Sequence, residues 1–386
     1  MIRGFFKIVK KLFLILKNIN YTLNYPPKKK ILLFDENLKF YFLKYFKTDY
    51  EILHTRNLNY NLIVILKALL KYKFKFSLLN YFNLYVKFVN PKIVLTFTDN
   101  HPFFWRLEVA KNTKKIFLQA AQRTETKEDV FFYKKKFVES KKKNFVDYMF
   151  VFNKKIGKIY SSFIEGKYII IGSVKSNAFR ILKNKKKFDL LFISTWRDHP
   201  ENLKVTQNLK WKTLLDKHSK VLTRIKNYAI ENKKILTIYG CSDDPKEREF
   251  FSNILGKTRW KFLKNNRMKT YRYVDNAKIV ISTLSTLGIE TCARKSKLAV
   301  INPLKLDKLS ISRKFAWPYK LKKEGPFWTS DISQKSINKL LTRVDAYQNH
   351  KWEKLKKKYL KDCIVYDPNN KTYVELIKRI LNKNQA

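Results

Sequence analysis

Short apolar runs rich in β-branched residues alternate with amphipathic segments along most of the chain, and this alternation constrains the fold more than any other feature. It is clearest in the second half, where the runs are DLLFIST (189–195), KILTIYG (234–240), KIVIST (278–283) and LAVINP (298–303). Strands that alternate with helices form βαβ units, and these units assemble parallel sheets. The second half therefore predicts a doubly wound α/β domain.

The first half repeats this pattern and predicts a second domain of the same class. Its expected strands are ILLFDE (31–36), YEILH (50–54), KIVLTFTDN (92–100) and KKIFLQAAQRT (114–124). A length of 386 residues also exceeds that of a typical single domain. We therefore expect two Rossmann-like domains, at residues 25–182 and 183–303. A helical extension at residues 304–386 is expected to pack back against the N-terminal domain.

The N-terminal segment, residues 1–24, predicts a basic amphipathic helix. Residues 1–19 read MIRGFFKIVKKLFLILKNI, and their longest unbroken apolar run is Leu12–Leu16. A membrane-spanning helix needs roughly 20 apolar residues, and a signal peptide needs about 7–15. No acidic residue precedes Asp35, so the segment suits the interface of an anionic cytoplasmic membrane. The alternative is a helix that packs on the protein's own core.

The formal net charge is +52, from 83 Lys and Arg against 31 Asp and Glu. Such a charge predicts attraction to phosphorylated ligands, anionic lipids or nucleic acid. Biased codon usage is a competing explanation, because Lys, Asn, Ile, Phe and Tyr share A/T-rich codons. The lysines also spread through nearly every segment rather than over one face, which disfavours specific nucleic-acid binding. The charge alone therefore identifies no partner.

Cysteine and histidine usage predicts neither a disulfide framework nor a metal site. Cys241, Cys292 and Cys363 lie far apart without C-x-x-C spacing, and the five His residues show no metal-binding spacing. Cysteines of this kind fit a reducing cytosol. We therefore expect a cytoplasmic protein with no bound metal and no tightly held cofactor.

Polar residues follow three predicted strands of the second half, at Ser194–Arg197, Gly240–Ser242 and Ser282–Thr286. Ligands of open parallel sheets bind beyond the carboxyl ends of the strands, where helix N-termini present free N–H groups. The planar guanidinium of Arg197 suits phosphate oxygens. Neither G-x-x-x-x-G-K-[ST] nor G-x-G-x-x-G occurs, which argues against a P-loop kinase and a dinucleotide dehydrogenase.

The turn at residues 282–286 carries the strongest signal. Ser285 is placed to cap the following helix and to leave neighbouring N–H groups for a phosphate. Thr286 and Glu290 lie four residues apart and so share one helical face. A carboxylate at this position is placed to accept hydrogen bonds from both hydroxyls of a ribose, and is expected to have no structural partner. The alternative is a helix cap with an acidic residue favoured near the helix N-terminus.

The stretch YVDNAKIVISTLSTLGIETCARKSKLAVINP (273–303) resembles the donor-site region of GT-B glycosyltransferases. It is most similar to bacterial surface-carbohydrate-biosynthesis transferases with an S-T-L-G-x-E turn. The segments EILHTRNLNYNLIVILKALL (51–70) and PKIVLTFTDNHPFFWRL (91–107) are similar to the first half of the same family. The resemblance covers most of residues 30–303, and it implies GT-B architecture with an acceptor-side N-terminal domain and a nucleotide-donor C-terminal domain.

What the resemblance implies is transfer of a sugar from a nucleotide-sugar donor to a surface polysaccharide or lipid-linked glycan acceptor, without a metal. The expected place is the inner face of the cytoplasmic membrane. A polyol-phosphate transferase with a CDP-linked donor is the alternative. Two alternatives come from other classes: a basic nucleic-acid-binding protein and a non-catalytic binding module. The last is raised by Gln119–Gln122, where the family is expected to have a Q-N-G-like turn.

Candidate site residues follow from this assignment. An inverting transferase must remove a proton from the acceptor hydroxyl, so Asp99 is the expected base, with His101 as the alternative. A helix cap at Asp99 and Asn100 is the competing interpretation. Arg123, on the acceptor side with Asn100, is expected to bind either an anionic acceptor or the donor phosphate. The expected donor-binding residues are Arg197, Ser285, Thr286 and Glu290.

Overall fold

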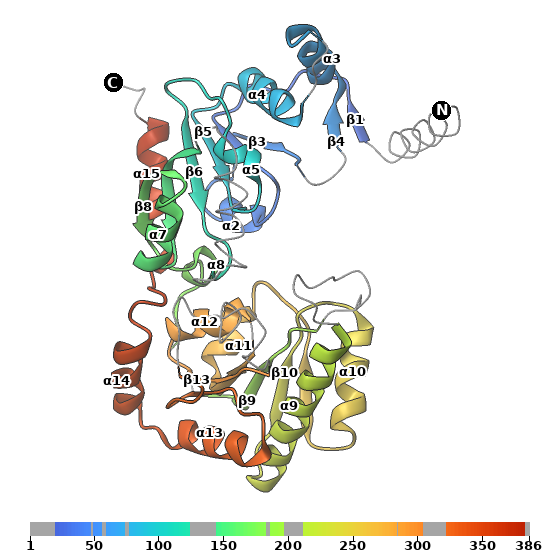
Figure 1. Ribbon diagram of the computed structural model, residues 1–386, viewed down its shortest axis with the longest axis vertical. Helices are drawn as coiled ribbons and strands as arrows, with labels where there is room; N and C mark the ends of the chain where they lie inside the picture. Colours follow the sequence, from blue (N-terminus) through green and yellow to red (C-terminus); the bar gives the residue numbers. More distant parts are fainter. Residues whose placement is uncertain are drawn as a thin grey trace, which may run out of the picture.

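The computed structural model describes residues 20–47, 49–55, 59–73, 77–123, 144–182, 186–196, 211–283, 285–303 and 322–382. These residues form two lobes, each built on a six-stranded parallel sheet flanked by helices (Figure 1). The predicted fold, two Rossmann-like domains in GT-B architecture, is confirmed. The expected amphipathic helix lies outside the described residues, apart from its last positions. There Asn20–Thr22 form strand β1, not helix, because they pair with another strand.

The N-terminal sheet has the strand order β3-β2-β5-β6-β7-β8. Its strands are β2 (Ile31–Phe34), β3 (Tyr50–Leu53), β5 (Ile93–Thr96), β6 (Lys114–Leu118), β7 (Phe145–Val151) and β8 (Glu165–Ile170). Its helices are α2 (Lys39–Leu43), α4 (Leu78–Val89), α5 (Pro102–Trp105) and α7 (Lys154–Ser161). All residues of β2 and β5 are buried, as expected for parallel strands covered on both faces. The strand order reverses between β2 and β5.

The C-terminal sheet has the order β11-β10-β9-β12-β13-β14. Its strands are β9 (Phe188–Ile193), β10 (Leu236–Tyr239), β11 (Trp260–Leu263), β12 (Ala277–Ser282), β13 (Lys297–Ile301) and β14 (Trp328–Thr329). Its helices are α9 (Trp211–Glu231), α10 (Pro245–Leu255), α11 (Thr270–Asp275), α12 (Thr286–Cys292) and α13 (Gln334–Ala346). Here the order reverses between β9 and β12, and ligands of doubly wound sheets bind at such a point.

The C-terminal segment differs in one respect from the helical extension expected from the sequence. Strand β14 pairs with β13, but two residues are too few to show a periodicity. The segment continues through α14 (Asn349–Tyr359), a 3-10 turn (Pro368–Asn370) and α15 (Lys371–Asn382). The last helix buries Tyr373 and Ile377 in the same apolar cluster as Phe42 and Phe150 of the N-terminal domain. The chain therefore returns to its first domain, as expected.

A small unit stands beside the N-terminal sheet. Strand β1 pairs in parallel with β4 (Asn59–Asn61), and α3 (Leu62–Lys71) follows β4 directly. Asn61 caps α3 by accepting a hydrogen bond from the N–H of Val64 at 3.0 Å. In Figure 1 this unit lies at the end of the N-terminal domain that is remote from the C-terminal domain.

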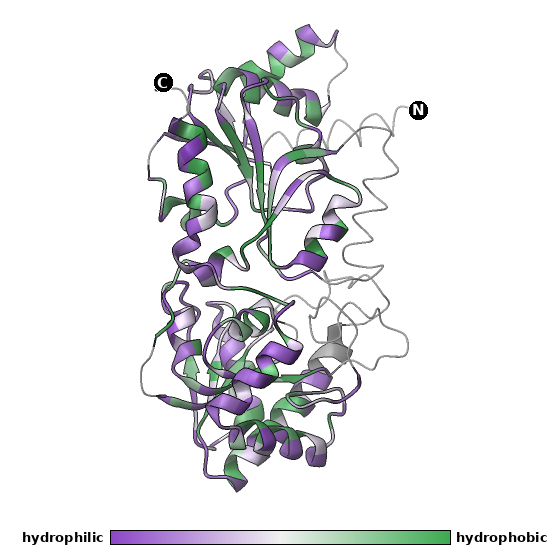
Figure 2. Ribbon diagram, turned by 90° about the vertical axis from the view of Figure 1, so that its left-hand side faces the viewer, coloured by the Kyte–Doolittle hydropathy of each residue, from purple (hydrophilic) through white to green (hydrophobic). Residues whose placement is uncertain are grey.

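The two lobes remain distinct when viewed from the side (Figure 2). The short helix α8 (Val174–Asn177) lies at their junction, after the last strand of the first sheet and before the first strand of the second. Within the part of the chain that the structure describes, no helix combines the length and apolarity needed to cross a bilayer.

Candidate active site

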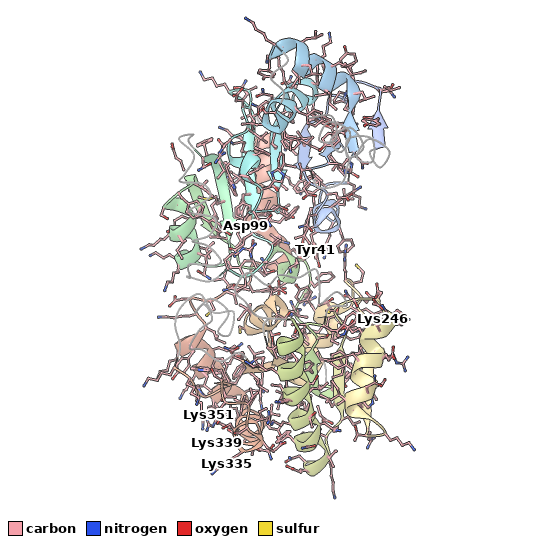
Figure 3. All side chains as sticks on the ribbon, turned by 45° about the vertical axis from the view of Figure 1, so that its right-hand side comes forward. Tyr41, Asp99, Lys246, Lys335, Lys339 and Lys351 are labelled. Atoms are coloured by element: carbon pink, nitrogen blue, oxygen red, sulfur yellow. The ribbon has the colours of Figure 1, made fainter. Side chains whose placement is uncertain are left out.

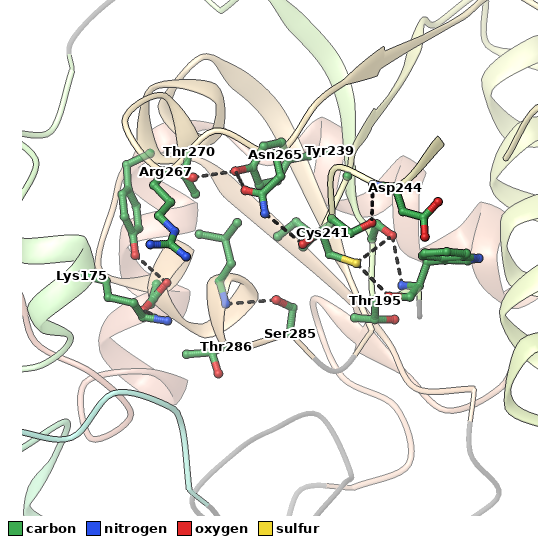
Figure 4. A pocket seen from close by; sticks show the side chains of 18 of the residues that line it. Lys175, Thr195, Tyr239, Cys241, Asp244, Asn265, Arg267, Thr270, Ser285 and Thr286 are labelled. Atoms are coloured by element: carbon green, nitrogen blue, oxygen red, sulfur yellow. Dashed lines mark hydrogen bonds and ion pairs between the residues drawn. The ribbon is translucent and has the colours of Figure 1, made fainter. Parts of the chain in front are cut away.

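A cleft of about 930 Å³ opens at the carboxyl edge of the C-terminal sheet (Figure 4). Most of its lining comes from the ends of β9 and β10, from α11 and from the start of α12. Tyr41 of α2 and Lys175 of α8 also line it. The cleft therefore lies where the strand order reverses and where the two domains meet.

The turn before α12 has the geometry that its sequence predicts. The hydroxyl of Ser285 accepts a hydrogen bond from the N–H of Leu287 at 3.2 Å and so caps the helix. A Cβ atom on Gly288 would overlap the side chain of Ser282, so glycine at this position lets α12 pack closely on the end of β12. Ser285 and Thr286 both line the cleft. Their role in binding phosphate stays a prediction.

Glu290 lines the cleft but also has structural partners, so the expectation that it has none is wrong. Its side chain is 1% exposed. One carboxylate oxygen accepts a hydrogen bond from Ser173 at 2.5 Å and lies 3.6 Å from the ammonium of Lys175. The other accepts a hydrogen bond from the hydroxyl of Tyr271 at 2.8 Å. Since Ser173 and Lys175 belong to the α8 region, Glu290 connects the two domains at the edge of the cleft.

The turn after β10 is occupied by the protein's own carboxylate. Glu247 is fully buried and accepts hydrogen bonds at 2.9 Å from the N–H groups of Cys241 and Ser242 and from the Ser242 hydroxyl. Successive backbone N–H groups of this kind form an anion site, and here Glu247 satisfies them. The turn after β10 is one of the three strand ends expected to bind a ligand, but its N–H groups bind Glu247 instead.

The wall of the cleft beyond this turn is polar. The hydroxyl of Tyr239 lies 2.5 Å from that of Thr270 and donates to the side-chain oxygen of Asn265 at 3.1 Å. The amide of Asn265 donates in turn to the carbonyl of Cys241 at 2.9 Å. Arg267 lines the same wall and, with Lys175, supplies positive charge to the cleft. Arg197, the other expected phosphate-binding residue, lies outside the described residues.

Behind the cleft, a histidine contacts the hydroxyls that follow β9 and β12. The Thr195 hydroxyl lies 3.4 Å from that of Thr283 and 3.4 Å from Nδ1 of His218, which belongs to α9. Burial lowers the pKa of His218 from its ordinary value of 6.5 to about 4. The ring is therefore neutral at physiological pH and is placed to hold the Thr195 hydroxyl.

This histidine predicts a loss of stability in mild acid. Between pH 6.5 and about pH 4 the unfolded chain binds a proton at His218 that the folded chain does not bind. The free energy of unfolding should therefore fall as the pH falls through this range, by about 2 kcal/mol at pH 5. Urea unfolding at pH 7 and pH 5 measures the change. In His218→Gln the difference between the two pH values should shrink by this amount, and an unchanged difference would refute the assignment.

On the N-terminal side, the buried Asp99 forms an ion pair with the half-buried Arg123. Nε and Nη2 of the guanidinium each lie 2.6 Å from one carboxylate oxygen, and the hydroxyl of Tyr160 donates to the same carboxylate at 2.6 Å. Burial favours a raised pKa for Asp99, but the charge and hydrogen bonds of Arg123 and the Tyr160 hydrogen bond outweigh it, so the pKa lies below 3.8. This geometry suits a carboxylate that orients Arg123 better than it suits the base expected from the sequence. Figure 3 shows Asp99, like Tyr41, in the part of the domain that faces the second lobe.

The other acceptor-side candidates lie next to this pair. His101 precedes α5, and its ring contacts Phe34, Phe82 and Phe103 with centroid distances of 5.0, 5.9 and 5.6 Å. Asn100 is exposed. The structure thus brings Asp99, Asn100, His101 and Arg123 together near the carboxyl end of β5, as the sequence predicts.

The turn at residues 119–122, which departs from the family pattern, connects the two halves of the site. The side chain of Gln119 accepts from the N–H of Phe152 at 2.9 Å and donates to the carbonyl of Ala121 at 2.8 Å. The N–H of Gln122 points to the Thr286 hydroxyl across the domain boundary, at 3.4 Å. None of the residues of this turn has a positive φ, so no glycine is needed there.

Sequence reasoning missed a buried ion pair of the C-terminal domain whose arginine also binds the segment between the domains. Arg294 and Asp275 are fully buried, and two hydrogen bonds join them. Nε and Nη2 of the guanidinium each donate to one carboxylate oxygen, at 2.7 and 2.6 Å. The same guanidinium donates to the carbonyls of Ser176, Phe179 and Arg180 at 3.1–3.2 Å. The only signal in the sequence is an arginine directly after the apolar face of α12. In the described part of the chain, no group of three or more acidic, His or Cys side chains is arranged to hold a metal ion.

Comparison with known proteins gives this site its context. Residues 116–381, more than half of the chain, match the family of O-antigen biosynthesis proteins. The chain belongs to this family. No curated protein sequence matches it.

Two solved structures share the fold over nearly the whole chain. A UDP-N-acetylglucosamine 2-epimerase from Listeria monocytogenes is 12% identical with a TM-score of 0.54, and the match covers 93% of this chain and 98% of the other. The wall teichoic acid polymerase TagF is 11% identical with a TM-score of 0.53, covering 94% and 91%. Identities this low establish the fold alone.

Proposed function

We propose that this O-antigen-family protein is a glycosyltransferase that moves a sugar from a nucleotide-sugar donor to a surface polysaccharide or lipid-linked glycan acceptor. The observation that carries the proposal is the cleft at the strand-order reversal of the C-terminal sheet, lined by residues of both domains. A site shared by two domains suits a reaction with two substrates, since each domain can hold one of them.

In this proposal the donor binds on the C-terminal side. Ser285 and Thr286 donate hydrogen bonds to the diphosphate, and Glu290 accepts hydrogen bonds from the ribose hydroxyls. Lys175 and Arg267 line the same cleft and neutralise the charge that develops on the leaving nucleotide, which positioned cations do in a water-poor site. We expect the reaction to proceed without a metal, as the family resemblance implies.

The acceptor binds on the N-terminal side. We propose that Arg123, held in place by Asp99 and Tyr160, binds an anionic group of the acceptor. His101 then becomes the stronger candidate for the base, because both oxygens of Asp99 already accept hydrogen bonds. The acceptor is expected at the inner face of the cytoplasmic membrane. A polyol-phosphate transferase with a CDP-linked donor would use the same donor side.

Nucleotide binding tests the proposal. The full-length protein is heated with UDP, CDP, GDP and ADP and with the matching monophosphates. A ligand present at 100 times its Kd stabilises the folded state by about 2.7 kcal/mol, so one base should raise the melting temperature, and its diphosphate more than its monophosphate. A CDP preference would favour the polyol-phosphate alternative. Stabilisation by duplex DNA at physiological salt, with none by any nucleotide, would contradict the proposal.

A further inference from the structure

Exposed apolar side chains gather at one end of the N-terminal domain. In the described part of the chain, six of the ten exposed large apolar residues lie between residues 21 and 78, and the other four are scattered. The six are Tyr21, Leu23, Tyr25, Leu66, Leu70 and Leu78. Exposed apolar residues that cluster mark a contact surface, whereas single ones need no explanation.

Helix α3 is the centre of this cluster. Its inner face carries Val64 and Ala68, which are fully buried. Its outer face carries Leu66 and Leu70, which are 60% and 66% exposed and lie four residues apart on one side of the helix. A surface helix normally has a polar outer face. We call the surface formed by Leu66 and Leu70 the α3 face.

The exposed residues Leu23 and Tyr25 follow β1, and their segment lies next to the start of α3. The Asn61 side chain, which caps α3, donates a hydrogen bond to the carbonyl of Asn24 at 2.7 Å, and Asn24 lies between Leu23 and Tyr25. In both ribbon views α3 is the helix at the extreme end of the first lobe, away from the second lobe (Figures 1 and 2). The α3 face is therefore remote from the donor cleft.

The charge around the α3 face is mainly positive, although the exposed Glu108 lines the same pocket as Lys71. No acidic residue occurs between Glu51 and Asp99, nor before Asp35. The lysines beside the apolar residues, Lys67, Lys71 and Lys73, are exposed. Lysines next to apolar residues bury their stems along the apolar surface and keep their charge in water. A second copy of the chain would bring the same positive charge to the contact, whereas an anionic surface complements it.

We propose that the α3 face docks on an anionic lipid bilayer, with Leu66 and Leu70 entering the interface and the neighbouring lysines contacting lipid headgroups. Apolar burial combined with basic residues is the combination that binds interfacial helices to such surfaces. The inference deepens the membrane association in the proposed function and involves no residue before Tyr21. It places the acceptor-side domain on the membrane and leaves the donor cleft at the other end of that domain.

The first experiment locates the contact. In a Cys241→Ser background, where the two remaining cysteines are buried, Leu70→Cys carries an environment-sensitive fluorophore. The matched control is Ile230→Cys on α9, whose natural side chain is 55% exposed. With vesicles of phosphatidylglycerol and phosphatidylcholine, emission at position 70 should shift to the blue, and emission at position 230 should not. An unshifted signal at position 70 while the protein sediments with the vesicles would overturn the inference, and so would a failure to sediment.

The second experiment measures affinity. Leu66→Gln with Leu70→Gln should weaken binding to these vesicles by about tenfold or more, because two apolar side chains lose their burial. Ile230→Gln should not weaken it. Unchanged vesicle binding in the double variant would overturn the inference. In the fluorescence experiment, a shift at position 70 that occurs without vesicles and depends on protein concentration would also overturn it. Nucleotide binding should be the same in the double variant, so failure of this inference is distinguishable from failure of the proposed function.

Discussion

Replacement of Arg294 by methionine is expected to lower the free energy of unfolding by about 3–5 kcal/mol, because it leaves the buried carboxylate of Asp275 without its partner. It also removes the hydrogen bonds that Arg294 donates to the carbonyls of Ser176, Phe179 and Arg180. These hydrogen bonds hold the segment between the domains. Chemical denaturation monitored by tryptophan fluorescence measures the loss.

A matched control separates this effect from loss of any ion pair. Lys278 pairs with Asp189 at 2.8 Å, but the two side chains are 51% and 27% exposed. Lys278→Met should therefore cost at most about 1 kcal/mol. If Arg294→Met does not fold, Arg294→Met with Asp275→Leu should recover part of the stability, since a buried pair replaced by apolar residues is often tolerated. Equal losses for Arg294→Met and Lys278→Met would contradict this account of the domain junction.

Replacement of Glu290 by glutamine is expected to weaken nucleotide binding by roughly 10- to 150-fold, since hydrogen bonds to a charged group contribute about 1.5–3 kcal/mol. It should also lower the free energy of unfolding, by about 1–3 kcal/mol, because the amide cannot accept from both Ser173 and Tyr271 as the carboxylate does. Isothermal titration with the preferred nucleoside diphosphate and a melting curve on the same variant give both values.

Ser173→Ala is the control for this prediction. It removes one hydrogen bond to Glu290, and Ser173 itself does not line the cleft. The substitution should therefore lower the free energy of unfolding while affecting nucleotide affinity much less. If Glu290→Gln is destabilised but binds nucleotide with unchanged affinity, Glu290 is a structural link between the domains and not part of the donor site.

The sequence predicted the sheets well because several central strands contain apolar runs that stay buried on both faces, as in β2 and β5. It missed β1, β4 and β14, whose two or three residues are too short for any periodicity.

Local chemistry of the candidate site was also predictable, whereas its long-range pairs were not. The Ser285 cap involves neighbours in the chain, so the turn sequence was sufficient to predict it. The hydrogen bond from Ser173 to Glu290 joins residues 117 positions apart, and the bond from Gln122 to Thr286 joins residues 164 apart. Such contacts arise only when the two domains meet, and they change the role of Glu290 from an isolated ligand to a group shared by ligand and structure.

Photolabelling with a photoreactive analogue of the preferred nucleoside diphosphate tests the central claim most directly. The full-length protein is labelled, digested and mapped by mass spectrometry. The account predicts label on peptides that line the cleft, at Tyr41, at Lys175 or within residues 193–196, 239–271 or 285–290, and protection of these peptides by the unlabelled diphosphate. Label elsewhere on the chain, or label in the cleft that the unlabelled diphosphate does not displace, would contradict it.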